Sequence, residues 1–394
     1  MKWFQRLPCL LCLICLLAGC GDLSRETRAS SVPTPSPSQP EDSALEFQTP
    51  LFSNITPAIL WGRQQLSARA QTAYDKMSEA IACRQQTPLV VEADSQEIEL
   101  VLQALRIDHP EYFWFDGEAT FVSTQLAGVT VRTTCTFVYT MDLDEILLAG
   151  QQVQQYTAAC LSSSELAAAQ NDYEKILGVY RYIINNTDYV ITEADQSILS
   201  VMADHRGTCA GYARSFQYLM SQLGIPCTLA LGTGASGESH GWNMVQCQGS
   251  WYQMDVTWGD PVTPQGAPGD SLQYTYCLVT DAEIYRDHTL DSTLAMPVCM
   301  ETTWNYFRQE GLQFDTWDPN AYETALQAAL DQDVRWLSVR FSDNDSYQAA
   351  LEALLGDSLI MDMLERCGAL VSAQHQYVTY TQNDLFFEFS ILLN

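Results

Sequence analysis

The spacing of hydrophobic and polar positions predicts helices and strands in alternation along the first part of the chain. Apolar residues recur every three to four positions over Ile59–Cys83 and over Ser95–Arg106, which is typical of helices with one buried face. Ser95 or Asp94 is expected to cap the second helix. The strands predicted around these helices are Pro88–Glu92, Ala119–Thr124 and Val129–Met141. We therefore expect an accessory α+β region over residues 55–164.

The middle of the chain, residues 165–318, shows the same mixture of patterns. A long helix is predicted over Leu166–Asn185. Another apolar stripe begins at Cys209 and continues for about four turns, until Gly224 and Pro226 stop the helix. We expect this second helix to be buried, because its apolar positions lie close together along one face.

A hairpin and a small terminal unit complete the predicted pattern. Gln248-Gly249 is expected to form a two-residue turn between strands 241–247 and 251–257. Residues 319–394 are predicted to form a small C-terminal α+β domain. Its expected elements are helices Tyr322–Leu330 and Tyr347–Leu355 and strands Trp336–Phe341, Tyr377–Thr381 and Leu385–Leu393. The fold class predicted for the whole chain is therefore α+β.

The first 20 residues have the features of an export signal. Lys2 and Arg6 give a positively charged start, and an apolar run follows at Leu7–Leu17, which is too short to span a membrane as a helix. The run ends in Leu17-Ala18-Gly19-Cys20, which resembles a bacterial lipobox, in which the cysteine is lipidated and the chain is cut before it. We expect an exported protein anchored through Cys20 to the outer face of the bacterial cell membrane. The alternative is an ordinary secretory signal with an incidental cysteine.

Composition changes this picture in three ways. Residues 21–54 include a stretch rich in Ser and Pro and are predicted to be a tether. The chain has 48 Asp and Glu residues against 19 Lys and Arg, for a formal net charge of −29. Because lysine occurs only at positions 2, 76 and 175, no basic surface of useful size can form. We therefore expect no nucleic-acid partner, and contact with the membrane through the lipid anchor only.

The cysteine count leaves the state of the thiols open. Of 13 cysteines, three lie in the predicted signal and one is Cys20, so nine remain in the mature chain. Nine cannot all pair within one chain, and no Cys-x-x-Cys pair occurs among them. We favour buried, reduced cysteines over a disulfide scaffold. No particular pairing can be assigned, and no metal site is expected.

The residues with the clearest chemical pattern lie between positions 205 and 261. Cys209 occurs in His-Arg-Gly-Thr-Cys-Ala-Gly-Tyr-Ala, between Gly207 and Gly211, at the expected start of a helix. The N–H groups and the dipole at a helix N-terminus favour the thiolate form of a cysteine. Glycines on both sides are expected to let another chain approach the sulfur. Cys209 is thus a candidate nucleophile.

An imidazole and a carboxylate follow at a suitable spacing. If Gln248-Gly249 forms a two-residue turn, residue 242 faces residue 255, and His240 becomes the diagonal neighbour of Asp255 on one face of the sheet. A thiol, an imidazole and a carboxylate that orients the imidazole are the three groups that acyl transfer needs. Cys209, His240 and Asp255 are therefore the predicted catalytic residues.

Three sequence blocks carry a resemblance to a known family. Gly-Thr-Cys-Ala-Gly-Tyr-Ala, Ser-His-Gly-Trp-Asn-Met-Val and Trp-Tyr-Gln-Met-Asp-Val-Thr-Trp-Gly-Asp-Pro follow each other as in the bacterial transglutaminase-like superfamily. The chain resembles a lipoprotein member of this superfamily, most clearly over residues 165–265. The resemblance implies a papain-like core in which Cys209 is the nucleophile, His240 the general base and acid, and Asp255 the residue that orients His240.

Further site residues are predicted less directly. Acyl transfer needs a second donor for the oxyanion, and Tyr189 is a candidate because the family supplies this donor from upstream of the cysteine. Four residues that lie close to the catalytic residues in the sequence are candidates for the substrate cleft, namely Gly207, Gly211, Glu238 and Trp242. For Trp242 a place in the core is the favoured interpretation, and a place in the cleft wall is the alternative. His109, His288 and His375 are expected to have structural roles, and His205 is expected to be a loop or helix-cap residue.

Two functions from different classes fit the sequence. The first is a cysteine enzyme that acts on amide or peptide substrates through a thioester, with hydrolysis favoured over transamidation. Its substrate would be a peptide or protein, with cell-wall peptide as one candidate, and no cofactor is expected. The alternative is a non-catalytic surface module that binds cell-wall peptide or a protein partner. A reactive Cys209 distinguishes the first from the second.

Overall fold

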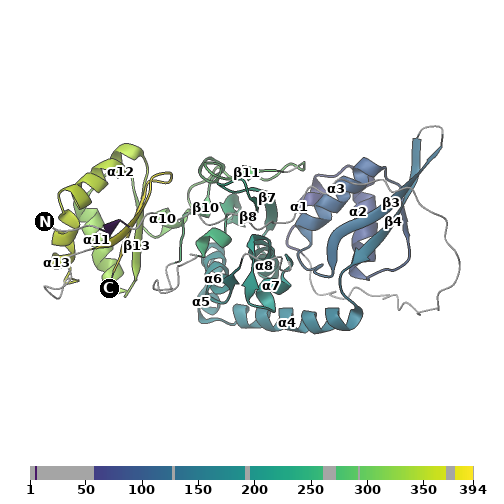
Figure 1. Ribbon diagram of the computed structural model, residues 1–394, viewed down its shortest axis with the longest axis horizontal. Coiled ribbons are helices and arrows are strands. Elements are labelled where there is room, and N and C mark those ends of the chain that lie inside the picture. Colours follow the sequence, from purple (N-terminus) through teal and green to yellow (C-terminus); the bar gives the residue numbers. More distant parts are fainter. Residues whose placement is uncertain are drawn as a thin grey trace. The chain divides into compact units, whose positions relative to one another are not determined.

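The computed structural model describes residues 5–6, 57–126, 129–190, 196–260, 272–291, 293–369 and 378–393. Helices and strands alternate along these residues, which confirms the predicted α+β class (Figure 1). They form two compact units, one of residues 57–248 with 290–297 and one of residues 5–6, 249–289 and 298–393, apart from the gaps given above. This division cuts the chain inside the predicted core of residues 165–318. The boundaries proposed from the sequence therefore stay predictions.

The predictions for the N-terminus fall almost entirely outside the described residues. These are the signal peptide at residues 1–20, the lipidated Cys20 and the tether at residues 21–54. The exception is Gln5–Arg6, which forms β1 and pairs in parallel with β14 (Thr379–Asn383).

The first unit begins with helices on a three-stranded antiparallel sheet. The elements are α1 (Trp61–Gln64), α2 (Ala68–Ala82), α3 (Ser95–Asp108), β2 (Leu89–Val91), β3 (Phe115–Leu126) and β4 (Val129–Tyr139), with strand order β2-β4-β3. The side chain of Ser67 accepts the N–H of Ala70 and starts α2, so the helix predicted over residues 59–83 is two helices. Asp94 and Glu97 form a capping box that starts α3, which confirms Asp94 as its cap.

Three helices connect this sheet to the core. They are α4 (Leu143–Leu161), α5 (Ser164–Ala168) and α6 (Asp172–Asn185). Helix α4 starts at a capping box of Asp142 and Glu145 and was not predicted. The helix predicted over residues 166–185 is interrupted, because the side chain of Asn171 accepts the N–H of Glu174 and starts α6 as a separate helix.

The core combines one buried helix with a five-stranded sheet. Its helical elements are α7 (Leu199–Met202), α8 (Cys209–Gln222) and the short 3₁₀ turn η1 (Thr257–Gly259). The sheet has the order β10-β9-β8-β7-β11, with β7 (Cys227–Thr233), β8 (Ser239–Cys247), β9 (Ser250–Met254), β10 (Cys277–Val279) and β11 (Thr289–Leu290). Gln248 and Gly249 both have positive φ, of 49° and 89°, as a type I′ turn requires. The predicted two-residue turn is thus confirmed.

Two short strands run beside the start of α8. They are β5 (Asp188–Tyr189) and β6 (Arg206–Gly207), which pair in parallel. Since Gly207 lies two residues before Cys209, this pairing places the Tyr189 segment next to the chain that enters α8.

The second unit contains a mixed sheet with helices. Its strands are β1, β14, β15 (Glu388–Leu392), β13 (Trp336–Phe341) and β12 (Gln313–Phe314), in that order across the sheet. Its helices are α9 (Asp281–Ile284), α10 (Tyr306–Gln309), α11 (Pro319–Asp331), α12 (Asn344–Leu351), the π-helical turn η2 (Glu352–Gly356) and α13 (Leu359–Arg366). The predicted strand at residues 336–341 is confirmed without change. Helix α13 was not predicted.

Arg340 is the most buried cation of the second unit among the described residues, with 3% of its surface exposed. Its guanidinium forms an ion pair with Glu388, donates to Glu283 at 3.0 Å and donates to the carbonyl of Thr275 at 2.5 Å. It also lies over the ring of Phe307, 4.5 Å from the centroid. These contacts join β13, β15, α9 and α10, so the charge pair is fully enclosed and fully bonded.

Replacing Arg340 with methionine is expected to destabilise this unit by about 3–5 kcal/mol, because Glu388 would remain as a buried carboxylate without its cation. Native-state hydrogen exchange of the β13 and β15 amides measures the effect. The matched control is Arg366→Met, which breaks an exposed pair with Glu323 and should leave the same amides as protected as before. Equal protection in the two variants would contradict the expectation.

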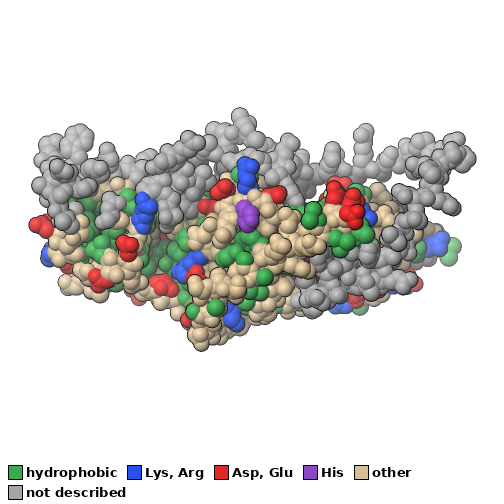
Figure 2. Space-filling view, turned by 90° about the horizontal axis from the view of Figure 1, so that it is seen from below, with side chains coloured by type: hydrophobic (Ala, Val, Ile, Leu, Met, Phe, Trp, Pro, Cys, Tyr) green, Lys and Arg blue, Asp and Glu red, His purple; other side chains and the backbone are tan. Residues whose placement is uncertain are grey.

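The surface of the described chain agrees with the predicted scarcity of cations. In the view of Figure 2, Lys and Arg side chains occur as separate spots among acidic and uncharged ones. No helix of the described residues combines the length and the apolar composition needed to cross a membrane.

Candidate active site

Cys209 is the first residue of α8, as the sequence predicts. The helix that it starts is buried over most of its length, including Tyr212, Phe216 and Leu219. Cys209 itself retains 8% exposure. A thiol at the N-terminus of a buried helix experiences the positive end of the helix dipole, which favours its ionised form.

The two glycines beside Cys209 have a packing role that differs from the predicted one. A Cβ atom on Gly207 would lie 2.9 Å from Cγ2 of Val201, and one on Gly211 would lie 2.2 Å from Oγ of Ser200. Both contacts are with α7. The missing side chains therefore make room for α7 against the start of α8. That the two glycines line the substrate cleft stays a prediction.

Tyr189, the candidate oxyanion donor, lies on a short strand beside the segment that leads to Cys209. It pairs with Gly207 across β5 and β6, and the N–H of the next residue, Val190, donates to the carbonyl of Gly207 at 3.0 Å. The ring of Tyr189 packs edge-on against Tyr212 of α8, at 6.2 Å between centroids. Its segment is thus fixed beside the approach to Cys209, and Tyr189 stays a candidate.

His240 lies on β8 with 6% of its surface exposed. Its ring stacks on Trp242, with centroids 6.1 Å apart and an angle of 18° between the planes. Trp242 has no exposed surface, so it supports the imidazole from the interior. The core interpretation of Trp242 is therefore correct, and it does not form an outer wall of a cleft.

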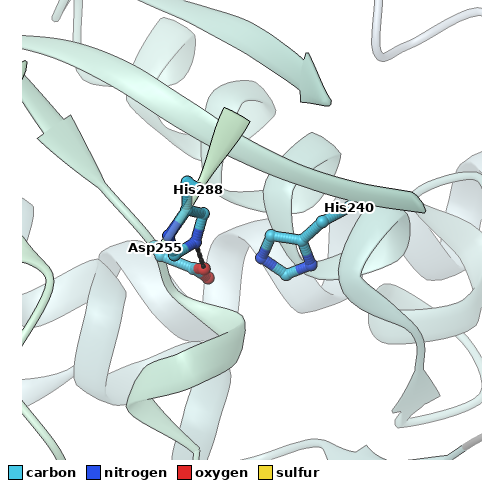
Figure 3. A group of neighbouring side chains, drawn as sticks. All are labelled: His240, Asp255 and His288. Carbon is cyan, nitrogen blue, oxygen red and sulfur yellow. Dashed lines mark hydrogen bonds and ion pairs between the residues drawn. The ribbon is translucent and has the colours of Figure 1, made fainter. Parts of the chain in front are cut away.

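Asp255 follows β9 and is completely buried. Its Oδ1 accepts the N–H of Trp258 at 3.1 Å, and its own N–H donates to the carbonyl of Tyr276 at 3.1 Å. These two bonds fix the carboxylate at the start of η1. Figure 3 shows His240 and Asp255 beside each other, with His288 on the carboxylate as a third member of the group.

The structure adds His288 to the predicted site residues. One ligand-type atom from each of His240, Asp255 and His288 lies within 4.8 Å of the other two, a spacing that could also hold a metal ion. However, both ring nitrogens of His288 and both oxygens of Asp255 already have hydrogen-bond partners. We therefore interpret the group as a hydrogen-bonded acid–base cluster.

The sequence contained little indication of the role of His288. It lies 33 positions after Asp255, beyond a segment outside the described residues, and no local motif connects the two.

The expected structural role for His109 agrees with its contacts, since its ring bonds to Glu111 at 2.6 Å and to the Tyr74 hydroxyl at 2.9 Å. His205 is exposed and bonds to the carbonyl of Asn186. His375 lies outside the described residues.

A cavity of about 290 Å³ opens beside His240. Residues from α3, β7, β8 and the segment after β11 line it, among them Arg106, Leu229, Leu231, Thr233, His240 and Leu294. Its size and its mixture of aliphatic and polar groups suit a side chain or a short peptide segment. Glu238, a predicted cleft residue, lies in the β7–β8 turn and accepts the N–H of Ser236 at 3.1 Å.

Comparison with known proteins identifies the family of this region. Residues 162–256 match the family model described as the transglutaminase-like superfamily. The chain contains a transglutaminase-like domain. The match includes Cys209, His240 and Asp255, and it confirms the resemblance found from the sequence blocks.

Individual relatives of the transglutaminase-like domain cover only part of the chain. Kyphoscoliosis peptidase from Mus musculus and from Homo sapiens is 26% identical over 151 residues, which is 34% of this chain and 23% of each relative. The matched region thus spans about a quarter of these curated relatives. A solved TGase structure is 13% identical and covers 46% of this chain and 54% of its own, with a TM-score of 0.27. A putative cysteine protease from Cytophaga hutchinsonii is 16% identical and covers 36% and 62%, with a TM-score of 0.24.

The other cysteines differ chemically from a candidate nucleophile. The nine cysteines from Cys83 to Cys367 are all thiols, seven of them buried. Burial raises the pKa of Cys135 to about 11 and the pKa of Cys160 and Cys247 to about 12. Burial also raises the pKa of the half-buried Cys83 and Cys367 above the ordinary value. These thiols are therefore poor nucleophiles in the folded protein.

Alkylation with iodoacetamide at pH 6 is expected to modify Cys209 at least about 100-fold faster than any other thiol from Cys83 to Cys367. A thiol with an ordinary pKa is only about 0.3% ionised at this pH, and the shifts above reduce that fraction further. Peptide mapping of the full-length chain after a short exposure gives the rates. Unfolded chain, in which all nine should react alike, is the control. Equal rates for Cys209 and Cys83 in the native protein would contradict the expectation.

Proposed function

We propose that this protein is a lipid-anchored, cell-surface cysteine enzyme that acts on amide or peptide substrates. Cys209 is the nucleophile, His240 the general base and acid, and Asp255 the residue that orients His240. The closeness of His240 and Asp255 carries the proposal, since their polar atoms lie within 4.8 Å although 15 positions separate the two residues. The position of Cys209 at the start of α8, inside the matched domain, supports it further.

The proposed reaction proceeds through a thioester. The Cys209 thiolate attacks the carbonyl carbon of the amide, and the C–N bond breaks as protonated His240 transfers its proton to the leaving nitrogen. Water then attacks the thioester while His240 accepts one of its protons, and that proton returns to the sulfur as the acid is released. The N–H of Cys209 and a group of the Tyr189 segment are the proposed donors to the oxyanion of each tetrahedral intermediate.

Hydrolysis is the favoured outcome for the second step. An amine could replace water in the attack on the thioester, and the three catalytic residues serve both reactions equally. The name of the relative kyphoscoliosis peptidase points to hydrolysis in a protein that shares this domain. The cavity beside His240 has Arg106 in its wall, and a cation is unsuited to holding an incoming protonated amine.

The deciding experiment offers a glutaminyl peptide and a labelled amine to the full-length chain and to its Cys209→Ala variant. If the wild type releases ammonia or cleaves the peptide without incorporating the label, and the variant does neither, the enzyme is a hydrolase. Incorporation of label that requires Cys209 identifies a transamidase. No reaction with any peptide of a broad library, together with an unreactive Cys209, would overturn the enzyme proposal in favour of a surface binding module.

The location of the enzyme is part of the proposal. A lipid on Cys20 would hold the protein at the outer face of the cell membrane, and its excess of acidic residues disfavours direct contact with anionic lipid headgroups. Labelling cells with a tagged fatty acid tests this, because a Cys20→Ser variant should take up no label. The proposed partner is a peptide or protein substrate outside the cell, with cell-wall peptide as one candidate.

A further inference from the structure

His288 lies between two carboxylates in the interior of its unit. Its Nε2 is 3.2 Å from Oδ2 of Asp255, and its Nδ1 is 2.7 Å from Oδ1 of Asp287. The side chains of His288 and Asp255 have no exposed surface, and that of Asp287 is 10% exposed. Water therefore contributes little to the hydrogen bonding of the ring, and each of its two nitrogens faces a carboxylate.

The protonation state of His288 follows from this arrangement. A neutral imidazole donates from one nitrogen only, which would leave the lone pair of the other facing a carboxylate oxygen. Both carboxylates already accept other hydrogen bonds, from the N–H of Trp258 to Asp255 and from the hydroxyl of Tyr276 to Asp287 at 2.6 Å. Burial and the neighbouring Asp287 raise the pKa of Tyr276, so this hydroxyl keeps its proton and donates. Both carboxylates thus act as acceptors.

We propose that His288 is an imidazolium that bridges Asp287 and Asp255 and positions Asp255 toward His240. This inference rests on the proposed function, in which Asp255 orients the catalytic imidazole. His288 is a positioning residue, because both of its nitrogens are bonded to carboxylates and no face of it is open to substrate. His288 and Asp287 thus support the three proposed catalytic residues from behind Asp255.

The bridge also sets the charge around Asp255. The titratable groups around His288 include Asp255, Asp287, Tyr276 and His240, and Glu388 acts on Tyr276 from β15. The rings of Trp258 and Tyr276 close the remaining sides, at 4.5 and 5.2 Å from the imidazole. With one imidazolium between two carboxylates, the buried group carries one net negative charge rather than two. Asp255 therefore stabilises protonated His240 less than an isolated buried carboxylate would.

The test uses the pH dependence of Cys209 alkylation in the full-length chain, which needs no knowledge of the substrate. In His288→Gln the compensating cation is absent, so protonated His240 is stabilised and the Cys209 thiolate is disfavoured. The plot of alkylation rate against pH is expected to have two inflections, one from Cys209 and one from His240. In His288→Gln both inflections are expected to move upward by about one pH unit. In Asp287→Asn a negative charge is removed instead, and both inflections should move downward.

The inflections are expected to shift in opposite directions in His288→Gln and Asp287→Asn. This distinguishes a positioning role of His288 from a purely structural one. Damage to the fold would lower the amplitude of alkylation in both variants without moving the inflections in opposite directions. Circular dichroism and the thermal unfolding midpoint show whether each variant is folded. Unmoved inflections in a folded His288→Gln, with wild-type Cys209 reactive at acid pH, would overturn the proposal. A wild-type Cys209 that is unreactive at acid pH would instead overturn the proposed function.

A second measurement examines the imidazolium without reference to Cys209. Nitrogen-15 spectra of the full-length chain with labelled histidines, assigned through His288→Gln, report the protonation of each ring nitrogen. Protons on both nitrogens of His288 at pH 7.5 are expected, well above the ordinary histidine pKa of about 6.5. A neutral His288 at this pH would overturn the proposed bridge even if Cys209 proved to be the nucleophile.

Discussion

Replacing Cys209 with alanine is expected to lower kcat/KM for an amide substrate by about 10⁴-fold or more, while the fold remains intact. The reason is that Cys209 is the proposed nucleophile, and burial raises the pKa of the other cysteines whose shifts are resolved, so they are poor substitutes. Removing one small side chain with 8% exposure at a helix start should affect stability much less than activity. The measurement is the initial rate with the glutaminyl peptide, under conditions in which the wild-type reaction is linear.

Cys83→Ala is the matched control for this variant. It makes the same chemical change at a half-buried position one residue beyond the end of α2, far in sequence from the matched domain. Its kcat/KM should equal that of the wild type within about twofold. A Cys209→Ala variant that keeps wild-type activity would show that the chemistry occurs elsewhere in the chain.

His240→Asn is expected to produce the second large loss, again about 10⁴-fold in kcat/KM. Asparagine fills part of the volume of the imidazole but cannot transfer a proton to the leaving amine. In the double variant Cys209→Ala with His240→Asn, the loss should be no larger than in Cys209→Ala alone. Groups that act together in one step are strongly non-additive. A loss equal to the product of the two single losses would contradict a shared step.

His205→Asn makes the same exchange at an exposed histidine. His205 lies four residues before Cys209 and has a positive φ of 54°, a conformation that asparagine adopts readily. Its activity should stay close to that of the wild type. If both histidine variants lost activity equally, the loss in His240→Asn could not be assigned to proton transfer.

The features predicted correctly from the sequence are those with local causes. The turn between β8 and β9 follows from Gln248-Gly249, since both residues are in the left-handed region that such a turn requires. The start of α3 follows from Asp94 and Glu97, and the start of α8 from Cys209 and the stripe after it. In each case the deciding contacts lie within a few residues.

Helix α4 could have been found by the same reasoning. Asp142 and Glu145 form a capping box, and the buried positions Ile146, Ala149 and Val153 follow at helical spacing. The error in the following helix is of the same kind, since the cap at Asn171 divides α5 from α6. One mistake is a missed helix and the other a missed boundary, and in both cases a side-chain cap marks the helix start.

The roles of His288 and of the glycines could not be predicted in this way. The partner of His288, Asp255, is distant in sequence, and the contact depends on the path of the chain between them. Gly207 and Gly211 flank a candidate nucleophile, so a place in the cleft is a reasonable expectation. Only the position of α7, with Ser200 and Val201 against them, shows that their small size serves internal packing.

The buried thiols give this protein a set of built-in reporters of local opening. Cys135 lies in the N-terminal sheet, Cys160 in α4, Cys247 in β8 and Cys299 in the second unit. A buried thiol reacts with an alkylating reagent only when its surroundings open, so at alkaline pH its rate measures the free energy of that opening. The order in which parts of the native protein open can thus be read from one unsubstituted chain, thiol by thiol.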